Sequence, residues 1–313
     1  MICLHCGELL NTPEERALKW HNRCIRKFFG TTVLPELQLS KRNLEKLIDA
    51  NINKGHTVPG VQKKLSLHLS QGRPSRLTMV GYPAGYIMKP QAEEYQNLPE
   101  YEFLAMLMAK AVGIKTVPFA LYYTGGKYVY LTKRIDRSDD GRMAMEDFCQ
   151  LQGRLVEDKY RGSYEGCARI IGKYSRSRDL DLAEMFSRIV LSFLVGNSDM
   201  HLKNFSLVES TPGARDFRLS AAYDILPVNV VEPRDEDEMA LSLNGKNRHL
   251  ERSDFMGFAH YCGITEKTAN RLIEYICNKK SLLEKMIDIS LLKESQKEAI
   301  STLLNERYLK LHQ

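Results

Sequence analysis

No apolar run in the sequence approaches the roughly 18 residues that a membrane span needs. The N-terminus likewise lacks the apolar core of a secretory signal peptide. The seven cysteines are an odd number scattered along the chain, which agrees with a reducing compartment rather than with a set of disulfide bonds. Internal repeats and low-complexity segments do not stand out either. We therefore expect a cytoplasmic protein that has no membrane partner.

The excess of positive charge is small. Lys and Arg number 45 against 39 Asp and Glu, and a net charge of +6 is too mild to indicate direct nucleic-acid binding. With 313 residues, 43% of them hydrophobic, the chain can form one large or two modest cores. Residues 231–238, which include the acidic run at 235–238, read as a solvated loop, and residues 264–310 as a C-terminal layer of helices.

The most informative feature is a set of three polar residues, Asp199, Asn204 and Asp224. Phosphoryl transfer needs a carboxylate that orients the attacking hydroxyl, an amide oxygen on Mg²⁺ and a second carboxylate on the metal. Asp199 and Asn204 are separated as in the catalytic loop of a protein kinase, and Asp224 lies where the downstream metal aspartate would be. By spacing alone, three such residues could also meet by chance in a loop.

The flanking patterns favour the kinase interpretation. Residues 181–195 repeat apolar positions with a helical period, which Gly196 ends. After Asn204, the segments 205–208 and 217–219 read as a β-hairpin around a Thr-Pro-Gly turn. Helix, catalytic loop, hairpin and metal aspartate follow one another as in the C-terminal lobe of a kinase.

The preceding part of the chain has candidate nucleotide-binding elements. The loop 55–64 leads into a strand with leucines at alternate positions and could approach phosphates, although such a loop is more often an ordinary turn. Lys89 ends a strand candidate and could contact the phosphates, or it could be an edge-strand lysine. Glu102, in the first turn of a helix ended by Gly113, could pair with Lys89 or could simply favour the helix N-terminus.

Strand 128–133 leads into the segment where two lobes would be joined, and there adenine would meet the backbone of Lys133 and Ile135.

The first 24 residues concentrate four potential metal ligands, Cys3, Cys6, His21 and Cys24. Two closely spaced pairs of these types are typical of a closed, tetrahedral, structural Zn²⁺ site. The alternative is a set of unpaired thiols near the terminus. The remaining cysteines have no ligand spacing and are expected in the core: Cys149, Cys167, Cys262 and Cys277.

Together these patterns predict an α+β, two-lobed protein-kinase-like fold behind a small zinc-knuckle-like module. The expected parts are a zinc-binding module (1–30), a connector with a short helix near 40–50 (31–54), a β-rich nucleotide-binding N-lobe (55–135) and a helical catalytic C-lobe (136–313).

From about residue 50 to the C-terminus, the chain resembles the HipA family of serine/threonine kinase toxins, and most closely the short HipT-type kinases. Seven motifs in order carry the resemblance: Gly60–Ser66, Tyr86–Pro90, Lys133–Arg137, Glu146–Gln150, Lys159–Tyr160, Gly196–Asn204 and Tyr223–Ile225.

The resemblance implies phosphorylation of a serine or threonine with ATP and Mg²⁺, in known members on an aminoacyl-tRNA synthetase. It also implies an antitoxin with a helix-turn-helix DNA-binding domain, and a separate small protein that supplies the N-terminal domain the short kinases lack. The alternatives are a small-molecule phosphotransferase and a zinc-module regulatory binding protein with an inactive kinase lobe.

Carried over residue by residue, the resemblance makes Asp199 the catalytic aspartate and Asn204 and Asp224 the Mg²⁺ ligands. His201 would make a catalytic-loop hydrogen bond or take part directly. Thr57, the only hydroxyl residue between Gly55 and Gly60, would be the site of self-phosphorylation. The nucleotide would be bound by Gly60, Val61, Gln62, Lys64, Lys89, Lys133, Ile135 and Tyr223.

Overall fold

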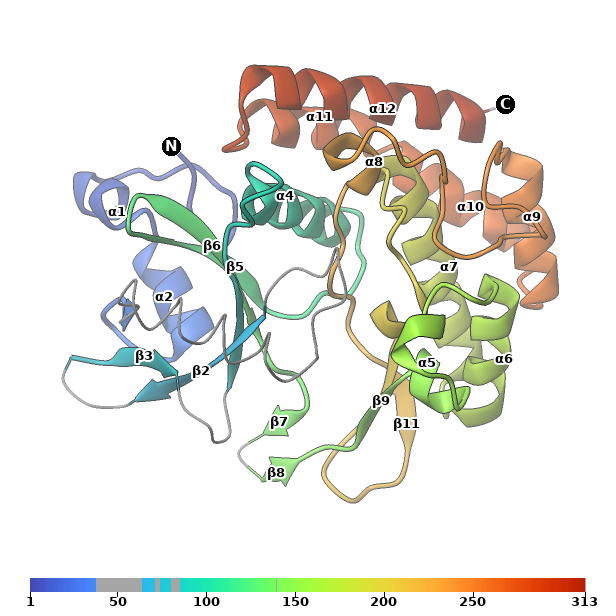
Figure 1. The fold of residues 1–313 in the computed structure, drawn as a ribbon, viewed down its shortest axis with the longest axis horizontal. Helices are drawn as coiled ribbons and strands as arrows, with labels where there is room; N and C mark the ends of the chain where they lie inside the picture. Colours follow the sequence, from blue (N-terminus) through green and yellow to red (C-terminus); the bar gives the residue numbers. More distant parts are fainter. Residues whose placement is uncertain (38–63, 71–73, 80–84, 139, 313) are drawn as a thin grey trace. The chain divides into compact units, whose positions relative to one another are not determined.

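The computed structural model describes residues 1–37, 64–70, 74–79, 85–138 and 140–312. The chain forms two compact units (Figure 1). Unit 1 comprises Met1–Phe103 and Pro118–Arg134, and unit 2 comprises Leu104–Val117 and Ile135–Gln313. The connector helix expected near 40–50 lies outside the described residues. None of the helices in the described part of the chain has both the length and the apolar composition that a membrane crossing requires.

Unit 1 is built on a six-stranded sheet with the order β1-β3-β2-β4-β6-β5. Neighbouring strands are antiparallel, except for the parallel pair β1 and β3. The strands are β1 (Glu36–Leu37), β2 (Leu65–Ser70), β3 (Arg76–Met79), β4 (Tyr86–Lys89), β5 (Phe119–Thr124) and β6 (Lys127–Lys133). In β2, Leu65 and Leu67 are buried and Ser66 and His68 are exposed, so the predicted alternation is confirmed over these four residues; Leu69 is only partly buried.

The N-terminal residues form part of the core of unit 1. The carbonyl of Leu4 accepts a hydrogen bond of 2.7 Å from the amide of Leu121 in β5. Helices α1 (Pro13–Leu18) and α2 (Asn22–Phe29) follow. On α2, Phe28 packs between the rings of Trp20 and Tyr86, and these three side chains are buried. The first 30 residues are therefore held to the sheet by both backbone and aromatic contacts.

Helix α4 (Leu98–Ala111) contributes residues to both units. The helix begins at Leu98, earlier than the sequence indicates. Glu102 therefore lies in its second turn and not, as predicted, in its first. The helix is followed by Gly113, whose φ of +85° lies in the left-handed region that glycine adopts without strain.

Unit 2 is mainly helical. Its helices are α5 (Phe148–Leu151), η1 (Val156–Asp158), α6 (Tyr164–Tyr174), α7 (Arg178–Val195), η2 (Leu202–Asn204), α8 (Val228–Val231), α9 (Arg252–Tyr261), α10 (Glu266–Cys277), α11 (Lys280–Asp288) and α12 (Glu294–His312). The central helix α7 packs against α6, α10 and α12 (Figure 1). Both the helix expected at 181–195 and the C-terminal helical layer are confirmed.

Gly196 ends α7 with φ +72°. The left-handed backbone favours glycine, and a Cβ at this position would lie 2.3 Å from a methyl carbon of Leu303 on α12, whose side chain would have to move. The catalytic-loop candidate starts directly after this turn.

A three-stranded sheet with the order β11-β10-β9 combines two strands that follow the loop with one that precedes it. Strands β10 (Ser206–Glu209) and β11 (Phe217–Leu219) are the predicted hairpin. Strand β9 (Met145–Asp147), which the sequence did not predict, pairs with the other side of β10. A short ribbon of β7 (Arg137–Ser138) and β8 (Gly141–Arg142) precedes it.

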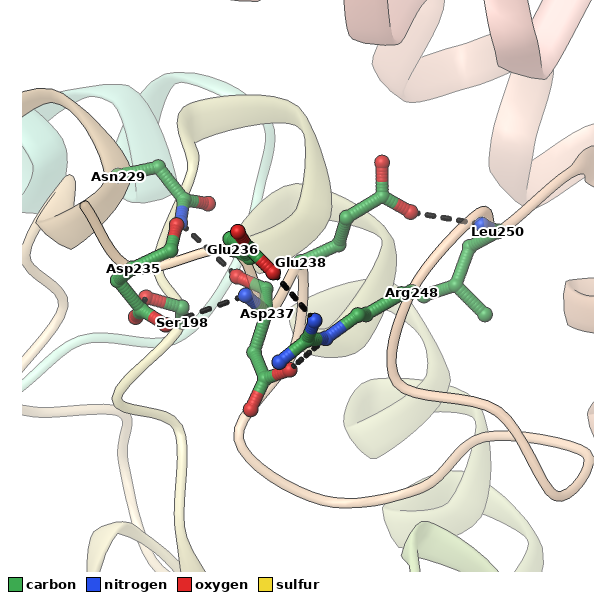
Figure 2. A network of polar contacts seen from close by, with 8 residues as sticks. All are labelled: Ser198, Asn229, Asp235, Glu236, Asp237, Glu238, Arg248 and Leu250. Atoms are coloured by element: carbon green, nitrogen blue, oxygen red, sulfur yellow. Dashed lines mark hydrogen bonds and ion pairs between the residues drawn. The ribbon is translucent and has the colours of Figure 1, made fainter. Parts of the chain in front are cut away.

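The interpretation of residues 231–238 as a solvated loop is wrong for Glu238, which is only 8% exposed. Its carboxylate accepts a bond of 2.6 Å from the amide of Leu250 (Figure 2). It also pairs with Arg307 at 2.9 Å and with Lys310 at 2.6 Å, both on α12. The acidic run is therefore fixed by a charged contact with the last helix.

The rest of the run is also paired. Figure 2 shows Arg248 bridging Glu236 and Asp237, at 2.6 and 2.5 Å. Asp235 accepts a hydrogen bond of 2.5 Å from the hydroxyl of Ser198, which precedes Asp199. The acidic run is thus hydrogen-bonded to the catalytic-loop candidate.

Candidate active site

The loop from Asp199 to Asn204 is closed by its own hydrogen bonds. The side-chain amide nitrogen of Asn204 donates to the carbonyl of Asp199 at 2.7 Å, and the amide of His201 donates to the same carbonyl at 2.8 Å. The amide of Asp199 in turn donates to the side-chain oxygen of Asn197 at 3.3 Å. Asn204 is 3% exposed. With its nitrogen committed to the backbone, its oxygen is the atom suited to a cation.

The carboxylate of Asp199 is 41% exposed. Its Oδ1 accepts a short hydrogen bond from the hydroxyl of Tyr160, and Nε2 of His201 lies 3.9 Å from the same oxygen. Burial lowers the pKa of His201, which is 6% exposed, so its ring is neutral near pH 7. The contact between His201 and Asp199 is therefore not an ion pair at that pH.

Asp224 has a φ of +60°, in the left-handed region that residues other than glycine seldom occupy. Such strain is held by the surroundings and concentrates at functional sites. Here, Ile225 is fully buried, and the hydroxyl of Tyr223 bonds to Ser206 at 2.6 Å and to the carbonyl of Lys203 at 3.1 Å. Tyr223, predicted to bind nucleotide, thus ties Asp224 to the end of the catalytic loop.

In unit 1, Nζ of Lys89 lies 2.6 Å from Oε1 of Glu102. The two side chains are 4% and 1% exposed, and Nζ also lies 5.4 Å from the ring centre of Tyr130. The predicted pairing of Lys89 with Glu102 is confirmed. A buried ammonium needs such a partner, because an isolated charge in a low-dielectric interior is very costly.

The remaining nucleotide residues are only partly described. Lys64 is exposed just before β2. Lys133 ends β6, and its amide already donates to the carbonyl of Pro118 at 2.9 Å, so this amide cannot bind adenine at the same time. Ile135 is the first residue of the second segment of unit 2. The positions expected in the phosphate loop that lie outside the described residues are Thr57, Gly60, Val61 and Gln62.

A second candidate site lies at the N-terminus, where the ligand atoms of Cys3, Cys6, His21 and Cys24 all lie within 4.8 Å of one another. The Nδ1 atom of His21 is 3.3 Å from Sγ of Cys6 and 3.9 Å from Sγ of Cys24. Its Nε2 lies 3.1 Å from the carbonyl of Leu9. In the neutral ring with its proton on Nε2, that nitrogen donates to the carbonyl and Nδ1 has a lone pair directed to the sulfurs.

Local structure brings these ligands together. Cys3 and Cys6 flank a tight turn, in which the amide of Gly7, with φ +76°, donates to the carbonyl of Cys3 at 3.0 Å. His21 is the N-cap of α2 and Cys24 lies in the first turn of that helix. Three thiols and one imidazole in this arrangement fit the preferences of Zn²⁺.

Sequence reasoning did not identify Tyr160 as a site residue. It lies 39 positions from Asp199, and neither periodicity nor spacing signals a contact over that distance.

Comparison with known proteins gives consistent matches. The model of the HipA-like C-terminal domain family matches residues 56–282. A Sinorhizobium fredii protein named "Putative kinase Y4dM" is 30% identical over 239 residues, which are 70% of this chain and 57% of the relative. The "Serine/threonine-protein kinase toxin HipA" of Shewanella oneidensis is 25% identical over 60% of this chain and 46% of the relative. The chain thus spans about half the length of these relatives.

Among solved structures, HipA of Shewanella oneidensis, in a complex with HipB and its operator DNA, matches with a TM-score of 0.69. The match covers 85% of this chain and 70% of that chain at 18% identity. The likeness concerns the fold, and it confirms a mixed α+β fold similar to that of HipA.

Proposed function

Because the chain belongs to the family of HipA-like C-terminal domains, we propose that it is a serine/threonine protein kinase that uses MgATP. The observation that carries the proposal is the arrangement of unit 2, where Asn204 is bonded to the backbone of Asp199 and Tyr223 ties Asp224 to the same loop. Named relatives that include a serine/threonine-protein kinase toxin support the same activity.

Asn204 and Asp224 would hold Mg²⁺. An amide oxygen and a carboxylate are the hard oxygen donors that this ion prefers. Bound there, Mg²⁺ would neutralise charge on the nucleotide phosphates. Lys89 would add a positive charge toward the phosphates, and Glu102 fixes the position of that ammonium.

Asp199 would act on the acceptor hydroxyl. As that oxygen forms its bond to the γ-phosphorus, the bond from phosphorus to the departing ADP oxygen breaks, and the hydroxyl proton passes to the carboxylate of Asp199. The partial exposure of Asp199 suits a side chain that must meet a residue of another protein.

The proposed role is that of a toxin. The Shewanella oneidensis relative was solved with HipB and operator DNA, which supports an antitoxin partner for this chain. We propose that its partners are a helix-turn-helix antitoxin and a small partner protein, and that its substrate is a translation-related protein such as an aminoacyl-tRNA synthetase.

For the N-terminal site we propose one structural Zn²⁺ ion. Four protein ligands leave no coordination position for a substrate. The ion would hold together a segment of about 30 residues, which is too short to form an adequate core of its own.

The kinase proposal is tested by incubating the purified chain with [γ-³²P]ATP, Mg²⁺ and a bacterial lysate. Labelled proteins are identified by mass spectrometry, and the Asp199→Ala variant is the matched control. We expect phosphoserine or phosphothreonine that depends on Asp199. Label found only in small molecules, or label that is equal in both samples, contradicts a protein kinase.

A further inference from the structure

The segment 159–164 is bonded to the catalytic loop at three points. The carbonyl of Lys159 accepts from the amide of Leu202 at 3.1 Å, and the hydroxyl of the buried Tyr164 donates to the carbonyl of Met200 at 3.1 Å. Between these anchors lies Tyr160, whose hydroxyl donates to Oδ1 of Asp199. The position of this hydroxyl is therefore set by the backbone on both sides.

Both neighbours of the carboxylate converge on one oxygen. The ring of Tyr160 packs edge-on against His201, with centres 5.1 Å apart and planes at 75°. His201 in turn approaches Oδ1 of Asp199 at 3.9 Å. Within the part of the chain that the structure describes, Oδ2 of Asp199 has no hydrogen-bond donor. The two oxygens of Asp199 thus have different surroundings.

We propose that Tyr160 is a positioning residue, which holds Oδ1 of Asp199 so that Oδ2 accepts the proton of the acceptor hydroxyl. The inference rests on the proposed kinase function. It gives separate roles to the two carboxylate oxygens of Asp199, the proposed catalytic base. A carboxylate without this bond turns more freely about its last torsion, and a displacement of about 1 Å at a reacting group can reduce a rate a hundredfold.

The Tyr160→Phe variant tests the inference, because it removes the hydroxyl and keeps the ring against His201. Tyr261→Phe is the matched control: Tyr160 and Tyr261 are both 48% exposed, and the hydroxyl of Tyr261 makes a hydrogen bond of 2.8 Å with Arg169, away from the catalytic loop. The rate of ADP release is measured with dephosphorylated casein as acceptor, and MgATP affinity by titration calorimetry.

We expect Tyr160→Phe to lower kcat about tenfold or more, with the Kd for MgATP and the melting temperature close to those of the wild type. Tyr261→Phe should leave all three values unchanged. An unchanged or increased kcat in Tyr160→Phe overturns the inference, since an increase would mean that Tyr160 blocks the base. A fall in kcat accompanied by equal losses of MgATP binding and thermal stability also overturns it, in favour of a general structural role.

A failure of the kinase proposal itself would look different. A wild-type protein that binds no MgATP, or binds it without any turnover, contradicts the proposed function and removes the basis of the inference. An active wild type with an equally active Tyr160→Phe variant contradicts the inference alone.

Discussion

Lys89 and Glu102 form an ion pair of 2.6 Å whose two side chains are almost completely buried. The contact joins the end of β4 to the second turn of α4. Removing two charges from water is costly, and their attraction offsets that cost only while both are present. The pair is therefore expected both to stabilise unit 1 and to position the lysine proposed to bind ATP.

Replacing one partner should be more damaging than replacing both. We expect Glu102→Ala to lower the free energy of unfolding by about 3–5 kcal/mol, because the buried ammonium of Lys89 loses the carboxylate that lies 2.6 Å from it. The double variant Lys89→Met with Glu102→Leu should recover most of that stability and still fail to bind MgATP normally. Urea denaturation and titration calorimetry give the two quantities. Normal MgATP binding by the double variant would contradict the proposal that Lys89 binds the nucleotide.

Substitution of Asp199 and of Asp224 should impair different steps. Asp199→Ala should reduce phosphate transfer by about 10²–10⁴-fold and leave MgATP binding nearly intact, because this carboxylate acts on the acceptor hydroxyl. Asp224→Ala should lose the Mg²⁺-dependent part of ATP binding, since it removes a metal ligand. Calorimetry with and without Mg²⁺ distinguishes the two, and an equal loss of binding in both variants contradicts this division of roles.

Features with local signals could be predicted from the sequence. The apolar period of α7 and its glycine stop, the hairpin of β10 and β11, and the spacing of the four N-terminal metal ligands all depend on residues close together in the chain. The pairing of Lys89 with Glu102 could be predicted for the same reason, because the two residues lie on a strand and on the next helix along the chain.

Features set by distant segments could not be predicted. Glu238 appears solvated in the sequence, yet Lys310, 72 positions away on α12, pairs with it. The bond from Tyr160 to Asp199 likewise depends on the path of the chain between them, because the motif Lys159–Tyr160 singles out the residue without indicating its partner. The left-handed backbone of Asp224 has only a weak signal, since aspartate occupies that conformation more often than most residues other than glycine but does not require it.

Glu100 gives a prediction on pH dependence. It is 7% exposed, Asn97 donates to its Oε1 at 2.8 Å, and among the described residues Oε2 has no partner. Burial raises the pKa of this carboxyl above its ordinary value. The folded state thus holds the proton more tightly than the unfolded state, so stability falls as pH rises from about 4.3, the ordinary value for glutamate.

We therefore expect Glu100→Gln to stabilise the protein at pH 7, by the roughly 0.5–2 kcal/mol typical of such substitutions. The gain should shrink toward pH 4, where the carboxyl is largely protonated in the folded state. Urea denaturation at both pH values measures it, with the exposed Glu93→Gln as the control. A gain that is the same at both pH values would show that the charge of Glu100 is not its source.

Thr57 should be the site of self-phosphorylation if the loop before Gly60 approaches the γ-phosphate. Phosphate there adds about −1.5 to −2 charge, which should repel the nucleotide and weaken ATP binding. Incubation with MgATP should yield a Thr57 phosphopeptide in the wild type and none in Asp199→Ala, and Thr57→Asp should raise the Kd for MgATP. Peptide mapping of active enzyme that always finds Thr57 unmodified would leave regulation to partner proteins.

The cluster of Cys3, Cys6, His21 and Cys24 should hold about one Zn²⁺ per chain in protein purified without chelators. Cys6→Ser should reduce the metal content to near zero, because serine is a poor ligand for this ion. Cys262→Ser, which alters a buried thiol outside the cluster, should retain the metal. Elemental analysis of the three proteins provides the measurement.

The bound ion should also stabilise unit 1, since the ligands are assembled only in the folded state. A strong chelator should therefore lower the melting temperature of the wild type and of Cys262→Ser, and leave that of Cys6→Ser unchanged. His21→Ala should behave as Cys6→Ser does, because its Nδ1 faces the sulfurs. Metal-free wild-type protein with the same melting temperature with and without chelator would mean that the four side chains gather through packing alone.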